Sequence, residues 1–175
     1  VTPLSIIASN LERALISLES KDVIDLETKT LLKMTMELAQ GLEPYLIENT
    51  TPEGSTLRNL AEDTLKHDWR GSDPSQTNSL EPEMLSGHVE GMFLRQIVAL
   101  ANCKNVLEIG LFSGYSALAM AQALPEEGRL VACEIDDDAA KFALSQFSKS
   151  RHGHKIEVRL GDALVTLKAL MEENA

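Results

Sequence analysis

The sequence predicts an α/β protein in which a parallel sheet follows a helical N-terminal region. From residue 105 onward, short apolar runs alternate with amphipathic segments and are joined by short loops, which is typical of βαβ units. Before residue 70, apolar residues recur every three or four positions, as they do in helices. The turn Gly110-Leu-Phe-Ser-Gly114 joins the first apolar run to the helix that follows it. A strand, a glycine turn and a helix in this order indicate a ligand site at the carboxyl end of a sheet.

The N-terminal region contains three amphipathic segments. We expect helices over residues 4–20, 22–40 and 52–69, the last with Thr51 as its N-cap. Asp22 is a candidate N-cap of the second helix, and Gly41 is its expected C-cap.

A loop and one further helix lead to the sheet. Residues 70–80 have no apolar period and are rich in turn residues, so we expect a mobile loop that divides a helical region, residues 1–80, from a sheet-forming region, residues 81–175. Within the helix expected over residues 81–101, Gly87 and Gly91 allow two explanations. They either permit close helix packing or mark an irregular helix start that touches a ligand.

The sheet-forming region alternates strands with helices. We expect strands at residues 105–109, 129–134 and 156–160, and helices at 115–124, 137–150 and 163–172. Such an order predicts right-handed crossovers and a parallel sheet.

Composition excludes several classes of protein. The net charge of −11 argues against a nucleic acid or an anionic membrane surface as the main partner. Cys103 and Cys133 are too few for a disulfide framework, and we expect both thiols to be reduced. No apolar run approaches the length of a membrane span, so we expect a cytoplasmic protein.

The glycine turn differs from the turns that bind pyrophosphate. Those turns carry G-x-G-x-x-G, but here Phe112 stands at the second glycine position and a third glycine is absent. Glu108 precedes the turn, and a carboxylate there favours a cationic or hydroxyl-bearing ligand over a phosphate. We expect the backbone N–H groups of the turn to be free to face this ligand.

Two further elements follow the next two strands. Glu134 ends the second strand, where a carboxylate can accept both hydroxyls of a ribose. Gly161-Asp-Ala163 follows the third strand and can offer a backbone N–H and a side-chain acceptor to an adenine edge. With the glycine turn, these elements indicate a site for S-adenosylmethionine. Ser116, in the first turn of the next helix, is a candidate to bond the amino-acid part of this cofactor.

The segment from Glu108 to Pro125 resembles the glycine motif of class I S-adenosylmethionine-dependent O-methyltransferases of the caffeoyl-CoA and catechol type. The resemblance continues through Gly128–Glu134, His154–Val158 and Gly161–Leu164, and it reaches upstream to Glu83–Leu94. It implies a Rossmann-like sheet of the class I methyltransferase type, here truncated after about three strands. The cofactor contacts that it implies are Ser86, Glu108, Gly110, Leu111 (through its backbone), Ser116, Glu134 and Ala163.

The resemblance also implies a divalent metal, with Mg²⁺ expected, in the full-length enzyme. The aspartate-rich motif that holds this metal in the family has no match in Lys168–Ala175, so we expect no metal ligand in this chain and name no catalytic residue. His88 is a candidate for the acceptor pocket. In this fold a fourth strand pairs with the first, so Val106–Ile109 would otherwise be a bare apolar edge, which we expect the rest of the protein or a partner chain to cover.

A narrower resemblance concerns the acceptor. The strings Gly41–Tyr45, Thr50–Glu53 and Glu83–His88 are similar to cyanobacterial O-methyltransferases of mycosporine-like amino acid synthesis, which make 4-deoxygadusol. This likeness implies a small hydroxylated substrate, and the family implies a homodimer in which helical N-terminal extensions serve dimerisation or cap the acceptor pocket. The alternatives are a catechol or caffeoyl-CoA type enzyme for another phenol, a nucleotide-dependent oxidoreductase, and a non-catalytic cofactor-binding fragment.

Overall fold

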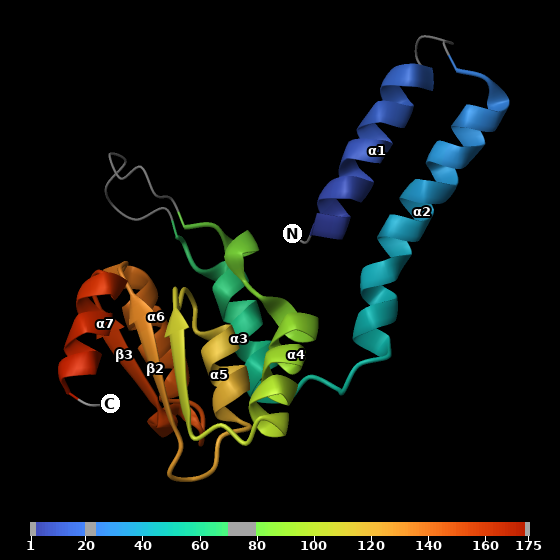
Figure 1. Ribbon diagram of the computed structural model, residues 1–175. Helices are drawn as coiled ribbons and strands as arrows, with labels where there is room; N and C mark the ends of the chain where they lie inside the picture. Colours follow the sequence, from blue (N-terminus) through green and yellow to red (C-terminus); the bar gives the residue numbers. More distant parts are fainter. Residues whose placement is uncertain (1–2, 20–23, 70–79, 174–175) are drawn as a thin grey trace. The chain divides into compact units, whose positions relative to one another are not determined.

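The computed structural model describes residues 3–19, 24–69 and 80–173, and its elements follow the expected order of helices and strands (Figure 1). The chain divides into two compact units, Val1–Pro52 and Glu53–Ala175. In the described ranges no helix combines the length and the apolar character that crossing a membrane requires. The predicted loop at residues 70–80 lies, up to residue 79, outside the described residues.

The first unit is a pair of helices, α1 (Pro3–Glu19) and α2 (Leu26–Glu48). Their contact buries Ala8, Leu15 and Ala39. The N-cap of α2 is Asp25, whose side chain accepts the backbone N–H of Thr28 at 2.8 Å. The expected cap, Asp22, lies outside the described residues.

The prediction that the second helix ends at Gly41 was wrong, because α2 continues through Gly41 and Pro44 to Glu48. Proline has no N–H to donate to the carbonyl one turn earlier, so the helix loses one hydrogen bond at Pro44. The apolar spacing continues past it at Leu46 and Ile47, and Asn49 then ends the helix by donating its backbone N–H to the carbonyl of Tyr45.

The second unit contains a three-stranded sheet and its covering helices. In chain order its elements are α3 (Ser55–Lys66), η1 (Pro82–Met84), α4 (Gly87–Leu100), β1 (Asn105–Ile109), α5 (Tyr115–Ala121), β2 (Arg129–Glu134), α6 (Asp137–Phe147), η2 (Gly153–Lys155), β3 (Ile156–Leu160) and α7 (Ala163–Glu172). The three strands have the bounds that the sequence predicts.

The sheet is parallel and has the order β1-β2-β3. Glu108 of β1 pairs with Ala132, and Glu134 at the end of β2 pairs with Leu160, so both glutamates lie toward the carboxyl edge. Among the described strands β1 lies at one side of the sheet. Its residues Leu107 and Ile109 are 47% and 62% exposed, and the expectation that another part of the protein or a partner chain covers this strand stays a prediction.

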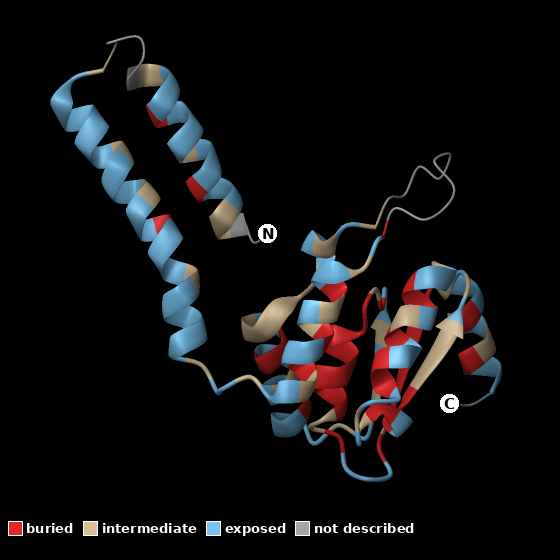
Figure 2. Cartoon of the chain, turned by 180° about the vertical axis from the view of Figure 1, so that it is seen from behind, coloured by how far each residue is buried: buried red, intermediate tan, exposed pale blue. Residues whose placement is uncertain are grey.

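The core lies between the sheet and helices α3 to α6. Every residue of α5 is buried, and so are five of the six residues of β2, whereas α1 and α2 are mostly exposed (Figure 2). Gly91 explains how closely α4 approaches α5, because a Cβ at this position would lie 2.7 Å from Cε1 of Tyr115. Close packing therefore accounts for Gly91, whereas Gly87, with φ +75°, gives α4 an irregular start.

The boundary between the compact units differs from the expected division at residue 80. Helix α3 lies in the second unit, and its residues Leu57 and Leu60 are fully buried in the core against α5. Local spacing shows that α3 has an apolar face but does not identify the partner of that face. The expected roles of residues 1–80, dimerisation or a cap, stay predictions.

Candidate functional site

The glycine turn lies at the carboxyl end of β1 and uses three residues with positive φ. Gly110 and Gly114 have φ values of +87° and +85°, which glycine adopts without steric cost. Phe112 has φ +49°, an uncommon value for a residue with a side chain. Its ring packs against buried Trp69, with ring centroids 4.5 Å apart, so the core holds the turn in this conformation.

Glu134 binds the turn from the end of β2. Its Oε2 accepts the backbone N–H groups of Leu111, at 3.0 Å, and Phe112, at 2.7 Å. Its Oε1 accepts those of Ile135, at 2.8 Å, and Asp136, at 2.9 Å. The carboxylate is buried and therefore joins two loops at the carboxyl edge of the sheet.

The expectation that the turn presents free N–H groups was wrong for four of its five residues. Gly110 donates to the carbonyl of Cys133, Leu111 and Phe112 donate to Glu134, and Gly114 donates to the carbonyl of Leu111. Both backbone polar groups of Leu111 are thus bonded within the chain. Glu134 occupies the position where an external anion would bind, and this explains in physical terms why the turn does not suit a phosphate.

Glu108 faces the same site from β1. Ser116 donates its hydroxyl to Oε1 of Glu108 at 2.5 Å, whereas Oε2 is buried without a partner among the described residues. The pKa of Glu108 is raised from the usual 4.5 to about 7, chiefly by burial and also by the nearby charge of Glu134, against the lowering effect of the Ser116 hydrogen bond. A cation placed at Oε2 would favour the ionised form of this carboxyl group.

The start of α4 lies beside the start of α5, because Gly91 contacts Tyr115, the first residue of α5. Ser86 and His88 lie about one helical turn before this contact, at the N-terminal end of α4. Ser86 precedes α4 without a side-chain capping bond. Nδ1 of His88 is buried and has no partner within the described residues.

The loop after β3 completes the carboxyl edge. Gly161 donates its N–H to the carbonyl of Glu134 at 2.7 Å, so this loop lies directly beside the end of β2. Asp162 caps α7 by accepting the N–H groups of Leu164 and Val165, and Ala163 is the first residue of the helix. One oxygen of Asp162 is thus used by the cap and not by an adenine.

Three buried polar side-chain atoms lack a hydrogen-bond partner among the described residues, and two of them belong to β1 and the glycine turn. Within the described residues they are Nδ1 of His88, Oε2 of Glu108 and Oγ of Ser113. Buried polar atoms normally find a partner, so Oε2 of Glu108 and Oγ of Ser113 remain available to a ligand at the carboxyl edge. The described residues contain no group of three or more His, Cys, Asp or Glu side chains that could hold a metal ion.

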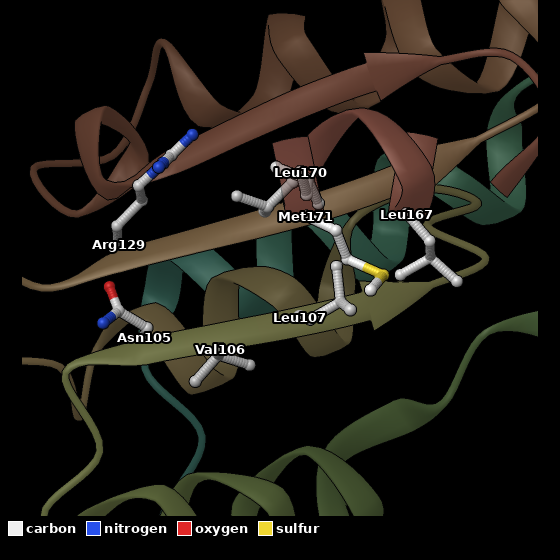
Figure 3. Close-up of a pocket in the computed structure, with 8 residues that line it drawn as sticks. Asn105, Val106, Leu107, Arg129, Leu167, Leu170 and Met171 are labelled. Carbon is white, nitrogen blue, oxygen red and sulfur yellow. The ribbon is translucent and has the colours of Figure 1, made fainter. Parts of the chain in front are cut away.

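A hollow of about 280 Å³ lies elsewhere, against the face of the sheet below α7 (Figure 3). Asn105 and Arg129, which begin their strands, line it together with Leu107, Leu170 and Met171. It is therefore open toward the amino ends of β1 and β2. Ligands of open α/β sheets bind at the carboxyl ends of the strands, so we do not assign the functional site to this hollow.

Two sets of contacts around the turn have no signal in the sequence spacing. Trp69 packs on Phe112 and on Phe142, and its Nε1 donates to the carbonyl of Thr64 at 2.8 Å. The hydroxyl of Tyr115 donates to Oε1 of Glu53, and burial raises the pKa of Tyr115 together with this hydrogen bond. Each set joins segments that are far apart along the chain, which local periodicity does not reveal.

Comparison with known proteins places these features in a family. A family model described as O-methyltransferase matches residues 50–175. Caffeoyl-CoA O-methyltransferase 3 of Nicotiana tabacum is 35% identical over 137 residues, which are 77% of this chain and 52% of that protein. Caffeoyl-CoA O-methyltransferase of Petroselinum crispum is 34% identical over the same shares.

Solved structures give the same result. The Bacillus cereus O-methyltransferase in complex with S-adenosylhomocysteine matches with a TM-score of 0.60 and 26% identity, over 75% of this chain and 55% of that one. The O-methyltransferase TomG of Streptomyces achromogenes, in complex with S-adenosylmethionine, matches with a TM-score of 0.63 and 28% identity, over 74% and 53%. These similarities confirm the α/β architecture predicted from the sequence.

Proposed function

The chain belongs to the O-methyltransferase family, and we propose that its glycine turn binds S-adenosylmethionine for transfer of the methyl group to a hydroxyl of a small metabolite. The chain spans about half the length of the curated relatives that it matches. The proposed methyl transfer is therefore an activity of the whole protein, in which residues 81–175 supply cofactor contacts. A cytoplasmic location is part of the same proposal.

The choice of cofactor rests on one observation: the carboxylate of Glu134 accepts the backbone N–H groups of Leu111 and Phe112. The turn then has few donors left for a pyrophosphate, and Glu108 adds a second carboxyl group to the same edge. These two carboxyl groups attract a ligand that carries a sulfonium and an ammonium group, and they repel the negatively charged pyrophosphate of a dinucleotide. This distinction argues against the oxidoreductase alternative.

The residues of this chain have separable roles in the proposal. S-adenosylmethionine supplies a methyl group on a positively charged sulfur. Glu108 accepts the ammonium group of the cofactor at Oε2, and Ser116 keeps the other oxygen in place. Ser86, Gly110 and Ala163 complete the cofactor contacts in this proposal. The backbone N–H of Leu111 is already bonded to Glu134, so Leu111 can add only the second lone pair of its carbonyl.

Glu134 reaches the ribose only by exchanging partners. A carboxylate has about four acceptor positions, and four backbone N–H groups already use them. In this proposal a ribose hydroxyl replaces the N–H group of Ile135 on Oε1, and that N–H group, in a residue that is 72% exposed, bonds to water instead. The bonds to Leu111 and Phe112 then remain and keep the turn in shape.

The acceptor and the metal belong to the same proposal. Similarity to caffeoyl-CoA O-methyltransferases supports a phenolic or enolic hydroxyl as the acceptor group. The strings Gly41–Tyr45 and Glu83–His88 favour the demethyl precursor of 4-deoxygadusol, with caffeoyl-CoA as the competing acceptor. Mg²⁺ stays a prediction for the whole protein, and we assign no step to it because the described residues offer no such site.

Calorimetry and mass spectrometry test the proposal. We expect S-adenosylhomocysteine to bind more tightly than NADH, and Glu108→Gln to weaken binding at least tenfold, while exposed Glu127→Gln leaves it unchanged. Methyl transfer from S-adenosylmethionine to each acceptor, with Mg²⁺ added, then identifies the substrate. If NADH binds and S-adenosylhomocysteine does not, the proposed cofactor is rejected. If S-adenosylhomocysteine binds but no methyl group is transferred, this chain supplies only the cofactor-binding part of the active site.

A further inference from the structure

Glu108 and Glu134 place two carboxyl groups on the same face of the sheet, near its carboxyl edge. Glu108 pairs with Ala132, and Glu134 is the next residue of β2 on that face. Four backbone N–H groups bond to the two oxygens of Glu134. Glu108 has one partner, the hydroxyl of Ser116, and its Oε2 is buried without a partner among the described residues. The chain therefore satisfies one carboxyl group fully and leaves one oxygen of the other unbonded.

The unbonded oxygen favours the neutral form of Glu108. An ionised Glu108 would hold negative charge on a buried oxygen that accepts no hydrogen bond, near the carboxylate of Glu134. Burying an unpaired charge costs far more free energy than burying a neutral polar group. Burial and, to a smaller extent, the charge of Glu134 accordingly raise the pKa of Glu108 to about 7, against the hydrogen bond from Ser116.

The strand and the helix next to β1 supply no basic side chain to Glu108. On β2, Arg129 and Cys133 belong to the opposite face of the sheet, because side chains alternate along a strand. On α5 the titratable residue is Tyr115, whose hydroxyl donates to Glu53. The charge that reaches Glu108 from these elements is therefore negative.

Helix α4, which packs on α5, does not supply a basic partner either. Its titratable residues are His88, Glu90 and Arg95, and none of them acts on the charge of Glu108. Nδ1 of His88 bonds to none of the described residues. The loop after β2 adds Asp136, an acid that caps α6. A cationic partner for Oε2 of Glu108 must therefore come from a ligand.

We propose that Glu108 carries a proton on Oε2 until the cofactor binds, and that the ammonium group of the cofactor displaces this proton into solvent. This inference rests on the proposed function, because it concerns the same cofactor. In the exchange the O–H bond of the carboxyl group breaks, its electron pair stays on Oε2, and the proton passes to water. An N–H group of the ammonium then donates to Oε2, while Ser116 stays bonded to Oε1. Binding of the cofactor is thereby coupled to the release of one proton.

The coupling depends on the ammonium group of the ligand and not on its sulfonium group. S-adenosylmethionine and S-adenosylhomocysteine share the ammonium group, so both should release the same number of protons. 5′-Methylthioadenosine keeps the adenosine and the sulfur but has no ammonium group, so it should bind without releasing a proton. Proton release by S-adenosylmethionine alone would contradict the exchange, because the sulfonium charge would then be its cause.

Calorimetry on the whole chain counts the protons. S-adenosylhomocysteine is titrated in phosphate and in bis-Tris, two buffers that take up a proton with different enthalpies, so the difference in heat gives the number released. We expect about one proton per bound ligand at pH 6 and about half a proton at pH 7. The affinity should rise about tenfold between pH 6 and pH 8, because the ionised fraction of Glu108 rises by that factor.

Three variants identify the group that loses the proton. Glu108→Gln should release none and should bind equally at pH 6 and pH 8. Ser116→Ala removes the hydrogen bond that lowers the pKa of Glu108, so its proton release should persist to higher pH. Glu127→Gln, at an exposed turn, is the matched control and should behave as the unaltered protein does.

Infrared difference spectra of the unaltered protein give a second measurement, which does not require a variant to bind. At pH 6, binding should remove the carbonyl band of a protonated carboxyl group and add the bands of a carboxylate. If S-adenosylhomocysteine binds at pH 6 without releasing a proton, this inference is overturned and the proposed function stands. Release that persists in Glu108→Gln also overturns it, because the proton then comes from another group. If S-adenosylhomocysteine does not bind at all, the proposed function fails and this inference fails with it.

Discussion

Replacing Glu134 by glutamine tests whether its carboxylate holds the glycine turn together. In Glu134→Gln one oxygen becomes an NH₂ group, which cannot accept the two N–H groups bonded to that oxygen. Hydrogen bonds to a charged acceptor are worth about 1.5–3 kcal/mol each, and a buried N–H without a partner costs about 1–3 kcal/mol. Since the carboxylate is buried, we expect the free energy of unfolding to fall by about 3–5 kcal/mol.

Urea unfolding measures this change, with the fluorescence of Trp69 as the signal. Trp69 is the single tryptophan of the chain and is buried against Phe112, so its emission reports on the unit that contains the turn. Glu127→Gln, at an exposed turn, should change the unfolding free energy by less than about 0.5 kcal/mol. A loss below about 1 kcal/mol in Glu134→Gln, together with lost cofactor binding, would refute the structural role and leave Glu134 a ligand residue only.

Three further predictions concern the same edge of the sheet. The pKa of Glu108 is raised to about 7, so the folded protein holds this proton more strongly than the unfolded chain. The contribution of Glu108 to stability is therefore full below about pH 4.5 and is lost as pH rises through 7, by up to about 3 kcal/mol. Urea unfolding of Glu108→Gln should not show this loss with pH. If the variant loses as much stability as the unaltered protein, Glu108 is not the group with the raised pKa. Gly114→Ala should cost about 2–4 kcal/mol, because its φ is positive and a Cβ would lie 2.5 Å from Cζ of Phe147. Gly110 also has positive φ, but its Cβ would meet no atom within 4 Å, so Gly110→Ala should cost only the backbone strain of about 1–2 kcal/mol. Calorimetry should show that Gly110→Ala instead weakens S-adenosylhomocysteine binding at least tenfold, and unchanged affinity would mean that no ligand lies over Gly110. Trp69→Leu should lower the stability measured by circular dichroism by about 2–4 kcal/mol. It should also lower the cofactor affinity, because Phe112 loses the ring that packs against it. An unaltered affinity would show that the turn keeps its shape without this contact.

Local patterns predicted the parts of this fold whose signals are local. The strand bounds at Asn105–Ile109, Arg129–Glu134 and Ile156–Leu160 agree with the structure because each strand is a short apolar run between turn residues. The helix ends agree less well. The helices expected to end at residues 124 and 150 end at Ala121 and Phe147, because tighter bonds, such as that from Ser150 to the carbonyl of Phe147, turn the last residues out of the helix.

Local sequence patterns did not predict contacts between residues that are far apart along the chain. The sequence identified Glu134 as a candidate ligand residue, but its four backbone donors come from two loops that only the folded sheet brings together. The packing of Trp69 on Phe112 likewise depends on where α3 ends in space. The apolar face of α3 was visible in the sequence, yet its burial against α5 was not, and this burial puts α3 in the second compact unit, which begins at Glu53.

The distance between α4 and α5 depends on Gly91, a residue outside the proposed cofactor contacts. Because this residue has no side chain, α4 rests directly on the ring of Tyr115, and one added methyl group would have to push the two helices apart. That displacement would carry the segment with Ser86 and His88 outward while the glycine turn stays fixed to the sheet. A substitution at position 91 would therefore change the spacing of α4 and α5 without replacing any residue that we propose to touch the cofactor.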